Sequence, residues 1–598
     1  MCGIVGYVGQ REAAPVLLEG LQRLEYRGYD SAGLALVHRG RLKVHKAAVR
    51  VRELREQVGK QPGGVGIAHT RWATHGEVND TNAHPHTDAT GRFAVVHNGI
   101  VENSDELRSK LTAAGVVLVS ETDTEALAHL IAAAAEQAET LEEAVRAALR
   151  GVEGTYGLVV LDSKRPDELV VARNGSPIVL GVGEGEMFIA SDVAALVRHT
   201  QRVVYLEDGE IATVRANDFH TTGRAQTVEL TDEDYELGEF SDFMRKEMAE
   251  QPEAVRRALR GRLDTRFATA HLGGIRMEPR ELRSVRRVKF LGCGTAYYAG
   301  QMGANLVEEL ARIPADAEPA SEFRYRNPVV DSDTLYVAIS QSGETLDTLA
   351  AVQELKRKGG NVIGAVNVVG SAVARECGSG VFLHAGPEVS VASTKAFTNM
   401  AVSFAMLALL LGRVRDLSAA HGARLVSALQ ALPDQIDTVL GLDHEIADVA
   451  GKYAAAEHMF FIGRVRGWPV AREGAQKLKE ISYVHAEAYQ AAELKHGPLA
   501  LIDPHMPSVV VVPRDELLAK NIGTIEQIKA RGGPVIAVTN AELPDGLADA
   551  VLRVPANEPE LDPILLTIPL QMLAYHVAAA LGRDIDKPRN LAKSVTVE

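Results

Sequence analysis

Near residue 240 the pattern of apolar and polar positions changes from one typical of antiparallel sheets to one typical of parallel sheets. Before that point, short runs rich in β-branched and aliphatic residues, such as 3–8 (GIVGYV) and 93–100 (FAVVHNGI), are separated by Gly, Asn, Asp and Thr. Two stretches with helical spacing, 13–24 and 123–149, interrupt them. For residues 1–238 we therefore predict an α+β layered domain with antiparallel sheets between helices.

Beyond residue 285, short apolar runs alternate with helical segments. The runs include 287–292 (RVKFLG), 334–340 (TLYVAIS) and 361–367 (NVIGAVN). This alternation predicts parallel α/β sheets. The intervening stretch, 239–284, begins at the end of an acidic segment and is interpreted as a linker.

An internal repeat divides this second part of the chain into two. Residues 354–367 (ELKRKGGNVIGAVN) align with 527–540 (QIKARGGPVIAVTN), and 290–295 (FLGCGT) align with 461–466 (FIGRVR). The two landmarks are separated by nearly the same length of chain in each copy, so a chance likeness between two strand–helix–strand units is the weaker explanation. We predict two doubly wound α/β domains followed by a tail, at 285–430, 431–587 and 588–598.

Charge and cysteine content narrow the possible partners. The formal net charge of −15 argues against nucleic acid or an anionic membrane surface. The three cysteines, Cys2, Cys293 and Cys377, lack the spacing of a metal site or a disulfide framework, which favours a cytoplasmic setting. The longest apolar run, 401–411, is too short to span a bilayer and predicts a buried helix. The histidines of 82–86 (NAHPH) lack further ligands at zinc spacing, so we expect neither a metal nor a cofactor.

Cys2 is the first candidate for chemistry. A lone cysteine is more often a small buried hydrophobe, but removal of the initiator methionine would leave Cys2 with both a thiol and a free α-amine. That amine can act as the general base for the thiol. Acyl transfer also needs donors aimed at an oxyanion, and Asn98 and Gly99 offer a side-chain amide and a backbone N–H. Arg71 suits a substrate α-carboxylate, and Asp123 suits a substrate α-ammonium.

Six segments around these residues resemble the N-terminal-nucleophile glutamine amidotransferases: 1–9 (MCGIVGYVG), 24–33 (LEYRGYDSAG), 68–76 (AHTRWATHG), 82–86 (NAHPH), 95–100 (VVHNGI) and 120–125 (SETDTE). The resemblance implies Cys2 as the nucleophile and Asn98 with Gly99 as the oxyanion hole. It also implies that Trp72 gates ammonia. The residues implied to surround the glutamine substrate are Arg71, Thr74, His75 and Asp123. Without the motif, Trp72 and His75 would be interpreted equally well as packing residues.

A candidate phosphate loop, 340–345 (SQSGET), follows the predicted strand 334–340 and precedes a helical stretch. Hydroxyls, a glycine and free N–H groups therefore gather where a parallel strand ends and a helix begins, which favours phosphate binding. A simple helix N-cap is the alternative, but a cap needs fewer polar residues than this loop has. The corresponding segment of the second copy, 511–516 (VVPRDE), lacks the hydroxyls, so we expect one phosphate site.

The second copy offers acid–base candidates instead. Lys477 and Glu480 are three positions apart and would share a helix face, although such a pair is commonly a solvated salt bridge. His496 precedes Gly497-Pro498 and should project from a loop, where a single histidine is more often structural. These residues gain weight only from their context.

That context resembles the isomerase half of the glutamine–fructose-6-phosphate aminotransferase family. The matching segments are 292–300 (GCGTAYYAG), 320–326 (ASEFRYR), 340–345 (SQSGET), 388–397 (EVSVASTKAF), 473–501 and 588–598 (PRNLAKSVTVE). With the amidotransferase segments, the resemblance covers essentially the whole chain. It implies transfer of the amide nitrogen of L-glutamine to D-fructose 6-phosphate in the hexosamine pathway, and a homodimer, because the family's counterpart of His496 comes from the neighbouring subunit.

The resemblance also implies a role for each site residue. His496 would open the sugar ring, Lys593 would form a Schiff base with the ketone, and Glu480, supported by Lys477, would move a proton between C2 and C1. The residues implied to hold the phosphate are Ser340, Gln341, Ser342 and Thr345. The residues implied to line the sugar pocket are Cys293, Thr295, Val391 and Ser393. Ala296 replaces the serine usual in the family, so one pocket hydrogen bond is expected to be absent.

Other functions fit the sequence less well. Residues 239–598 contain neither the phosphoribosyl loop of amidophosphoribosyltransferases nor the pyrophosphate loop of asparagine synthetases. A sugar-phosphate-sensing regulator would not need the acid–base set together with a glutaminase, and a sugar-phosphate deglycase would not need the glutamine domain. Ammonia released into water would protonate, so the two chemistries should communicate by a sheltered path.

Overall fold

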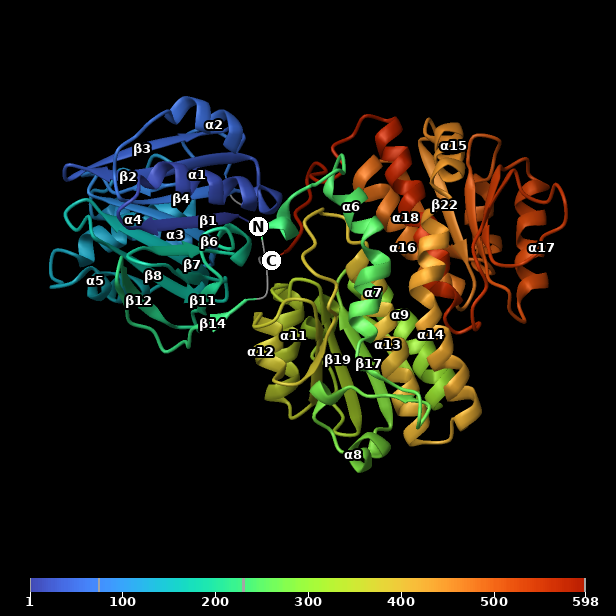
Figure 1. Cartoon of the computed structure of the whole chain (residues 1–598). Coiled ribbons are helices and arrows are strands. Elements are labelled where there is room, and N and C mark those ends of the chain that lie inside the picture. Colours follow the sequence, from blue (N-terminus) through green and yellow to red (C-terminus); the bar gives the residue numbers. More distant parts are fainter. Residues whose placement is uncertain (1, 74–75, 229–231, 596–598) are drawn as a thin grey trace. The chain divides into compact units, whose positions relative to one another are not determined.

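The computed structural model describes residues 2–73, 76–228 and 232–595, which form two compact units (Figure 1). The first unit contains the described residues of Met1–Glu236 and Ala592–Glu598, and the second is Leu237–Leu591. The finer boundaries, at 430 and 587, remain predictions.

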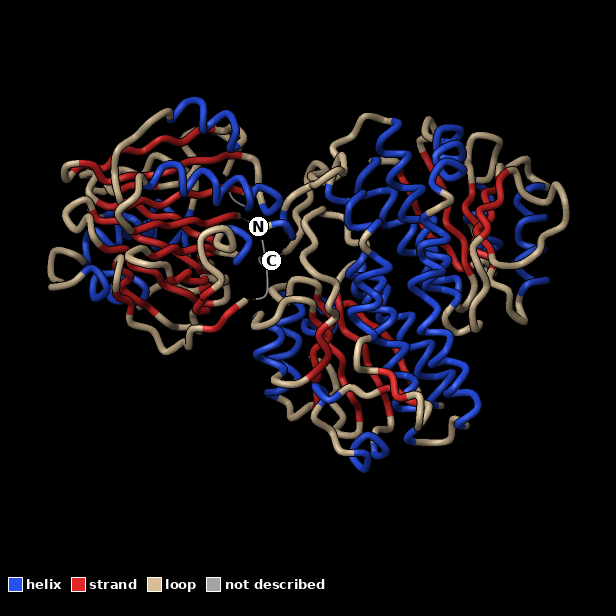
Figure 2. The backbone as a smooth tube through the Cα atoms, in the orientation of Figure 1, coloured by secondary structure: helices blue, strands red, loops and turns tan. Residues whose placement is uncertain are grey.

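Two antiparallel sheets form the centre of the first unit (Figure 2). One has eight strands in the order β14-β11-β9-β10-β1-β4-β2-β3, and the other has six in the order β13-β12-β8-β7-β6-β5. The strands are β1 (Gly3–Val8), β2 (Ser31–His38), β3 (Arg41–Ala47), β4 (Val65–Arg71), β5 (His86–Thr87), β6 (Phe93–Val101), β7 (Gly154–Asp162), β8 (Glu168–Asn174), β9 (Val179–Val182), β10 (Met187–Ala190), β11 (Arg202–Tyr205), β12 (Ile211–Arg215), β13 (Asp218–Phe219) and β14 (Gln226–Thr227).

Alternate residues of these strands face different layers, as the period of a β-strand requires. On β6, Ala94 and Val96 pack between the two sheets, whereas Val95 packs in a second cluster that includes Leu127 of α4 and Val145 of α5. The helices of the unit are α1 (Ala13–Leu24), α2 (Val51–Val58), α3 (Ser104–Ala113), α4 (Asp123–Ala134) and α5 (Leu141–Leu149). The predicted layered α+β architecture is confirmed.

The predicted helical stretch 123–149 is two helices rather than one. Thr140 caps α5, because its hydroxyl accepts the N–H of Glu143 at 3.1 Å while the Glu143 carboxylate accepts the N–H of Thr140 at 3.2 Å. This reciprocal capping box starts a new helix, and its T-x-x-E signature was already present in the sequence.

The second unit contains two five-stranded parallel sheets of identical topology. Their orders are β18-β17-β19-β20-β21 and β23-β22-β24-β25-β26, so the predicted pair of doubly wound folds is confirmed. The first set of strands is β17 (Arg287–Gly292), β18 (Ala315–Pro319), β19 (Thr334–Ser340), β20 (Asn361–Val366) and β21 (Gly380–Phe382). The second set is β22 (His458–Gly463), β23 (His485–Gln490), β24 (Ser508–Val512), β25 (Val535–Thr539) and β26 (Ala550–Arg553).

Helices fill the space between the two sheets of the second unit, as Figure 1 shows for α9, α13, α14, α16 and α18. The helices of the unit are α6 (Phe243–Ala249), α7 (Gln251–Leu259), α8 (Pro279–Ser284), α9 (Thr295–Ala311), α10 (Ala320–Tyr325), α11 (Leu346–Arg357), α12 (Ala372–Cys377), α13 (Lys395–Val414), α14 (Ala419–Leu440), α15 (Asp443–Tyr453), α16 (Gly467–Ser482), α17 (Leu518–Lys529) and α18 (Asp562–Ala580). Helices α6 and α7 lie in the predicted linker, yet Met244, Met248 and Val255 are part of the unit's hydrophobic core.

Two helices of the described chain, α13 and α18, are long and apolar enough to cross a membrane. In each, 83% of the apolar window is buried inside the protein, as expected for helices at the centre of a folded core. Helix α13 contains the apolar run 401–411 and packs against α9, so the prediction of a buried helix is confirmed.

Candidate active sites

Cys2 stands immediately before β1, at the edge of the first unit's core. Its thiol lies against the backbone of Trp72, whose N–H donates to Cys2 Sγ at 3.2 Å. Burial raises the pKa of the Cys2 thiol, while the Trp72 N–H and the Arg71 charge act in the opposite direction. The structure thus holds the predicted nucleophile in a fixed position beside two of its predicted neighbours.

Asn98 and Gly99, the predicted oxyanion donors, lie on β6 close to Cys2. Asn98 Nδ2 donates to the Cys2 carbonyl oxygen at 2.9 Å, and its Oδ1 lies 3.1 Å from His69 Nε2, which fixes the amide orientation. Gly99 has φ +134°, and a Cβ there would lie 2.1 Å from the Thr155 carbonyl oxygen. Only glycine fits this position without a backbone shift.

Arg71, at the end of β4, is 3% exposed. Its guanidinium donates to the carbonyl oxygens of Glu77 at 3.2 Å and Gly76 at 3.4 Å. Burial lowers the pKa of Arg71, and the negative charges of Asp30 and Asp123 oppose that effect. A buried guanidinium with weak backbone partners can exchange them for a substrate carboxylate, which binds it more strongly.

Buried histidines hold the start of α4, where Asp123 lies. His84 Nε2 is 2.8 Å from Thr124 Oγ1, and His86 Nε2 is 2.9 Å from Thr122 Oγ1. Burial lowers the pKa of both imidazoles well below its usual value, so both are neutral at pH 7. Through these two hydrogen bonds, the NAHPH segment fixes the residues on either side of Asp123.

Two predicted glutamine-binding residues, Thr74 and His75, lie outside the described residues. The structure adds Asp30, which the sequence interpretation did not single out although it lies in the LEYRGYDSAG motif. Asp30 Oδ2 accepts the N–H of Ala73 at 2.8 Å and so holds the chain directly after Trp72. Trp72 itself packs edge-on against Tyr29, with ring centroids 5.7 Å apart.

In the second unit, helix α16 brings the acid–base candidates together with Thr295 of α9. Lys477 Nζ donates to Glu480 Oε2 at 2.7 Å and to Thr295 Oγ1 at 3.0 Å. Glu473, one turn earlier on α16, lies 3.5 Å from Lys477 Nζ and accepts the Thr295 hydroxyl at 3.3 Å. Glu473 was missed because nothing in its sequence context distinguishes it from a surface glutamate on an amphipathic helix.

Burial separates the charge states of these groups. The side chains of Glu473 and Lys477 are 0% and 1% exposed, whereas that of Glu480 is 16% exposed. Burial raises the pKa of Glu473 to about 8, although Lys477 opposes the shift. Burial alone would lower the pKa of Lys477, but Glu473 and Glu480 outweigh it, and the pKa is raised. At pH 7 this gives a protonated Lys477 beside a largely protonated Glu473.

The predicted phosphate loop connects the end of β19 with the start of α11. Ser340 Oγ lies 2.9 Å from Thr345 Oγ1 and accepts the Gly343 N–H at 2.9 Å. Thr345 occupies the N-cap position of α11, but its side chain makes no capping hydrogen bond. The simple N-cap alternative is therefore disfavoured, and the uncapped N–H groups at the helix start suit an anion. Gly343 has φ +66° and packs directly against the Ser371 side chain, so there is no room for a Cβ at this position.

The predicted sugar-pocket residues lie at the start of α9 and in the segment before α13. Cys293 Sγ is 3.9 Å from Thr348 Oγ1 of α11, and Thr295 contacts Lys477, so the segment from Cys293 to Thr295 touches both the phosphate-loop helix and α16. Ser393 donates to Glu388 at 2.8 Å, and the Glu388 carboxylate acts electrostatically on Lys477. Val391 lies between them and donates its N–H to the Asp586 carbonyl oxygen at 3.1 Å.

His496 lies outside this set of hydrogen bonds. His496 is exposed at the end of a 3₁₀ helix, η5 (Glu493–His496), and among the described residues it makes no hydrogen bond to Glu480 or Lys477. Lys593 belongs to the terminal segment that groups with the first unit. Gln341 and Ser342 lie in the loop, and Ser342 accepts the Glu344 N–H at 3.2 Å. Ala296 is 8% exposed in the first turn of α9.

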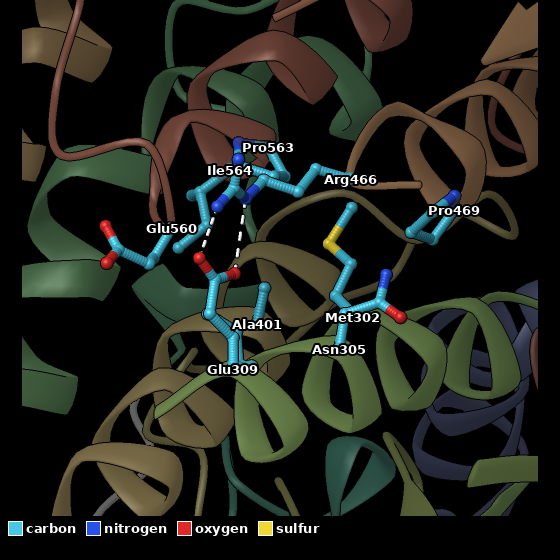
Figure 3. A pocket seen from close by; sticks show the side chains of 10 residues that line it. Met302, Asn305, Glu309, Ala401, Arg466, Pro469, Glu560, Pro563 and Ile564 are labelled. Carbon is cyan, nitrogen blue, oxygen red and sulfur yellow. Dashed lines mark hydrogen bonds and ion pairs between the residues drawn. The ribbon is translucent and has the colours of Figure 1, made fainter. Parts of the chain in front are cut away.

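The corresponding end of the second copy carries an ion pair. Arg466, directly before α16, donates to Glu309 near the end of α9, with Nε 3.2 Å from the carboxylate (Figure 3). Its Nη1 also lies 3.4 Å from Asp515 and from Glu516. These carboxylates outweigh burial and raise the pKa of Arg466. The pair borders a small pocket between α9, α16 and the start of α18.

Family models match both parts of the chain. A glutamine amidotransferase domain matches residues 69–198, and a SIS domain, the sugar isomerase module, matches twice, at 281–410 and 452–581. Over their full lengths, the chain is 48% identical to glutamine–fructose-6-phosphate aminotransferase (isomerizing) of Chlorobaculum tepidum and 50% identical to that of Thermus thermophilus. The chain belongs to the glutamine–fructose-6-phosphate aminotransferase family.

A solved structure from this family agrees with the fold. The C-terminal domain of glucosamine-fructose-6-phosphate aminotransferase from Francisella tularensis covers 59% of this chain and 99% of its own length, at 37% identity and a TM-score of 0.56. The two family matches to SIS domains coincide with the two parallel sheets. The internal repeat inferred from the sequence is therefore a duplicated sugar isomerase domain.

Proposed function

We propose that the protein transfers the amide nitrogen of L-glutamine to D-fructose 6-phosphate and isomerises the product to D-glucosamine 6-phosphate, releasing L-glutamate. This is the first step of the hexosamine pathway, which leads to UDP-N-acetylglucosamine. The observation that carries the proposal is the cluster of Lys477, Glu480 and Thr295 near the hydroxyl loop 340–345, in a chain that also holds Cys2 beside Asn98.

In the first unit, Cys2 attacks the glutamine amide while Arg71 and Asp123 hold the α-carboxylate and α-ammonium. The freed α-amine of Cys2 is the general base. Asn98 Nδ2, already 2.9 Å from the Cys2 carbonyl oxygen, and the Gly99 N–H stabilise the oxyanion of the tetrahedral intermediate. Trp72, Thr74 and His75 enclose the substrate, so that ammonia is released away from water.

In the second unit, the 340–345 loop binds the phosphate, and Cys293, Thr295, Val391 and Ser393 line the sugar pocket. His496 opens the ring. Lys593, from the tail that groups with the first unit, forms a Schiff base at the C2 ketone with loss of water, and ammonia displaces the lysine to give the ketose imine. Glu480 then moves a proton from C1 to C2 in the ketose imine, with Lys477 beside it to balance the charge. We infer a cytoplasmic homodimer in which His496 serves the neighbouring subunit, because His496 is exposed on its own chain. Neither nucleic acid nor a membrane is an expected partner, given the net charge of −15.

Isotope transfer tests the proposal. Purified protein is incubated with glutamine labelled with ¹⁵N in the amide and with fructose 6-phosphate, and the products are identified by mass. We expect glucosamine 6-phosphate that carries the label. In the Cys2→Ala variant, glutamine hydrolysis and label transfer should both fall below about 0.1% of the parent rate while the protein remains folded.

Two results would contradict the assignment. Near-normal glutamine hydrolysis in Cys2→Ala would show that another group is the nucleophile. Glutamine hydrolysis by the parent protein without any labelled amino sugar would restrict the chain to a glutaminase. Glutaminase turnover that does not change on addition of fructose 6-phosphate would count against coupling of the two chemistries.

A further inference from the structure

A histidine and two glutamates meet in the second unit, outside the predicted sugar site. His421 lies in the first turn of α14, and Glu558 and Glu560 lie on the segment that precedes α18. One ligand atom from each residue lies within 4.8 Å of the other two. His421 Nε2 and Glu560 Oε1 are 2.8 Å apart. The chain therefore brings one imidazole and two carboxylates to one point from two separate elements.

Glu560 is the buried member of this cluster. Its side chain is 8% exposed, and its second oxygen, Oε2, is buried with no hydrogen-bond partner among the described residues. A buried carboxylate oxygen without a donor is costly in a folded protein, so such an atom calls for a cationic or donating ligand. His421 and Glu558 are 26% and 28% exposed, which leaves the cluster open to ions and water from one side.

The nearby arginines do not supply this missing charge. Arg466 is directed at Glu309, Asp515 and Glu516, and Figure 3 shows the Glu560 carboxylate turned away from the Arg466–Glu309 pair. Within the described part of the chain, Arg424 forms an ion pair with Glu558 alone, with Nε 3.4 Å from its Oε2, and both side chains are partly solvated. Among the described residues, the Glu560 carboxylate has one hydrogen-bond partner, His421, and a single imidazole N–H satisfies only one of its two oxygens.

We propose that His421, Glu558 and Glu560 bind a divalent metal ion of the zinc class. Zinc takes imidazole nitrogen and carboxylate oxygen at about 2.0–2.2 Å in tetrahedral geometry, so two of its ligand atoms lie about 3.3–3.6 Å apart. The observed separations, 2.8 Å for one pair and no more than 4.8 Å for the others, reach that range by small side-chain rotations. Water completes the coordination on the exposed side. Magnesium is disfavoured, because it prefers oxygen ligands in a strict octahedron.

The ion would be structural and not part of the amino transfer. It would tie the start of α14, the helix that leaves the first sugar isomerase copy, to the segment that enters α18, a core helix of the second. Because the unfolded chain does not hold the three ligands together, metal binding would stabilise the folded state by mass action. The expected sign is a higher unfolding temperature in the presence of zinc.

Metal binding to the full-length protein tests the proposal. The chain is stripped with a chelator, titrated with Zn²⁺ and, separately, with Mg²⁺, and followed by thermal unfolding and by metal analysis after desalting. We expect retention of one zinc per chain and a saturable rise in the unfolding temperature, with no rise for magnesium. Glu558→Gln, which keeps the side-chain shape and removes the charge, should weaken zinc binding at least tenfold, and His421→Ala should abolish it.

A matched control uses an exposed histidine pair of the second unit. His458 and His485 lie on β22 and β23 with their Nδ1 atoms 3.3 Å apart, and both are exposed, so they offer zinc a surface alternative. His485→Ala should leave the stoichiometry and the thermal shift unchanged. Zinc retention that survives His421→Ala with Glu558→Gln, or that disappears with His485→Ala, would overturn the assignment. So would the absence of any zinc retention by the parent chain.

Discussion

The two sugar isomerase copies have the same arrangement of helices, but different residues stand at equivalent positions of α9 and α16. Thr295 follows Gly292 by three residues, and Arg466 follows Gly463 by three. Glu309 follows Gly292 by 17 residues, and Glu480 follows Gly463 by 17. Thr295 touches Lys477 of α16, and Arg466 pairs with Glu309 of α9. Glu309 is therefore the repeat counterpart of Glu480, the predicted proton carrier.

The two equivalent carboxylates, Glu480 and Glu309, have different partners. Glu480 is paired with Lys477, and Lys477 also binds Thr295, so a hydroxyl, an amine and a carboxylate lie together in this cluster. Glu309 faces Arg466, a guanidinium that stays charged at any physiological pH and holds the carboxylate by charge-assisted hydrogen bonds. A carboxylate held in this way cannot exchange protons with a substrate. Duplication of the domain produced two equivalent carboxylate positions, and the neighbouring residue determines which carboxylate can react.

The phosphate loop of the first copy also differs from the corresponding segment of the second copy. Strand pairing aligns Val337 with Phe290 in the first copy and Val509 with Phe461 in the second, so Ser340 corresponds to Val512. The N-cap residues are Thr345 for α11 and Leu517 for α17. The second copy has apolar side chains where the first has hydroxyls, which supports the expectation of a single phosphate site.

The largest effect should come from Glu480→Gln. The amide cannot carry a proton between C2 and C1, so amino-sugar formation should fall by about 10³-fold, within the usual range for removal of a general base. Glutamine hydrolysis at Cys2 should persist. Parallel assays of glutamate and glucosamine 6-phosphate measure both rates. A normal rate of glucosamine 6-phosphate formation would exclude Glu480 as the proton carrier.

Removal of the loop hydroxyls should have the next largest effect. Ser340→Ala and Thr345→Val each remove a donor to the phosphate, and hydrogen bonds to charged groups contribute about 1.5–3 kcal/mol. We expect KM for fructose 6-phosphate to rise about 10-fold or more, with a smaller change in kcat. Steady-state kinetics at saturating glutamine measure the two constants separately. A fall in kcat at unchanged KM would place these hydroxyls in the chemical step instead of in phosphate binding.

A smaller effect on rate, but a distinct effect of pH, is expected for Glu473→Gln. The glutamine resembles the protonated acid, so the rate at neutral pH should fall only about threefold, as for one altered neutral hydrogen bond. Folding raises the pKa of Glu473 from 4.5 to about 8, so its contribution to stability is complete below pH 4.5 and is lost as pH rises through about 8. The Glu473→Gln variant has no carboxyl group at this position, so it does not lose this contribution to stability as the pH rises.

Thermal unfolding measured between about pH 5 and pH 9 checks the sign. The unfolding temperature of the variant relative to the parent should increase with pH across this window. A constant difference would mean that Glu473 is already ionised in the folded protein, as the close approach of Lys477 alone would favour.

Much of this comparison could be predicted from the sequence, because it depends on local patterns. The strands, the repeat and the 340–345 loop follow from short-range periodicity and turn chemistry, and the break at Thr140 was visible as a capping signature. Glu473 and the Arg466–Glu309 pair could not be predicted in the same way. Their roles depend on the approach of α9 to α16, about 170 residues later in the chain, and sequence spacing does not report that distance.

The smallest effect on rate should come from Glu309→Gln, the same chemical change as Glu480→Gln at the corresponding position. Glu309 is 34% exposed, and Arg466 keeps Asp515 and Glu516 as partners, so the free energy of unfolding should fall by about 1 kcal/mol. Amino-sugar formation should change by less than about twofold, because the pair lies at the opposite end of α9 from Thr295. The measurements are denaturant unfolding and the same coupled assay. A loss of rate comparable with that of Glu480→Gln would mean that the second end takes part in the reaction and that the two copies are functionally less different than their residues indicate.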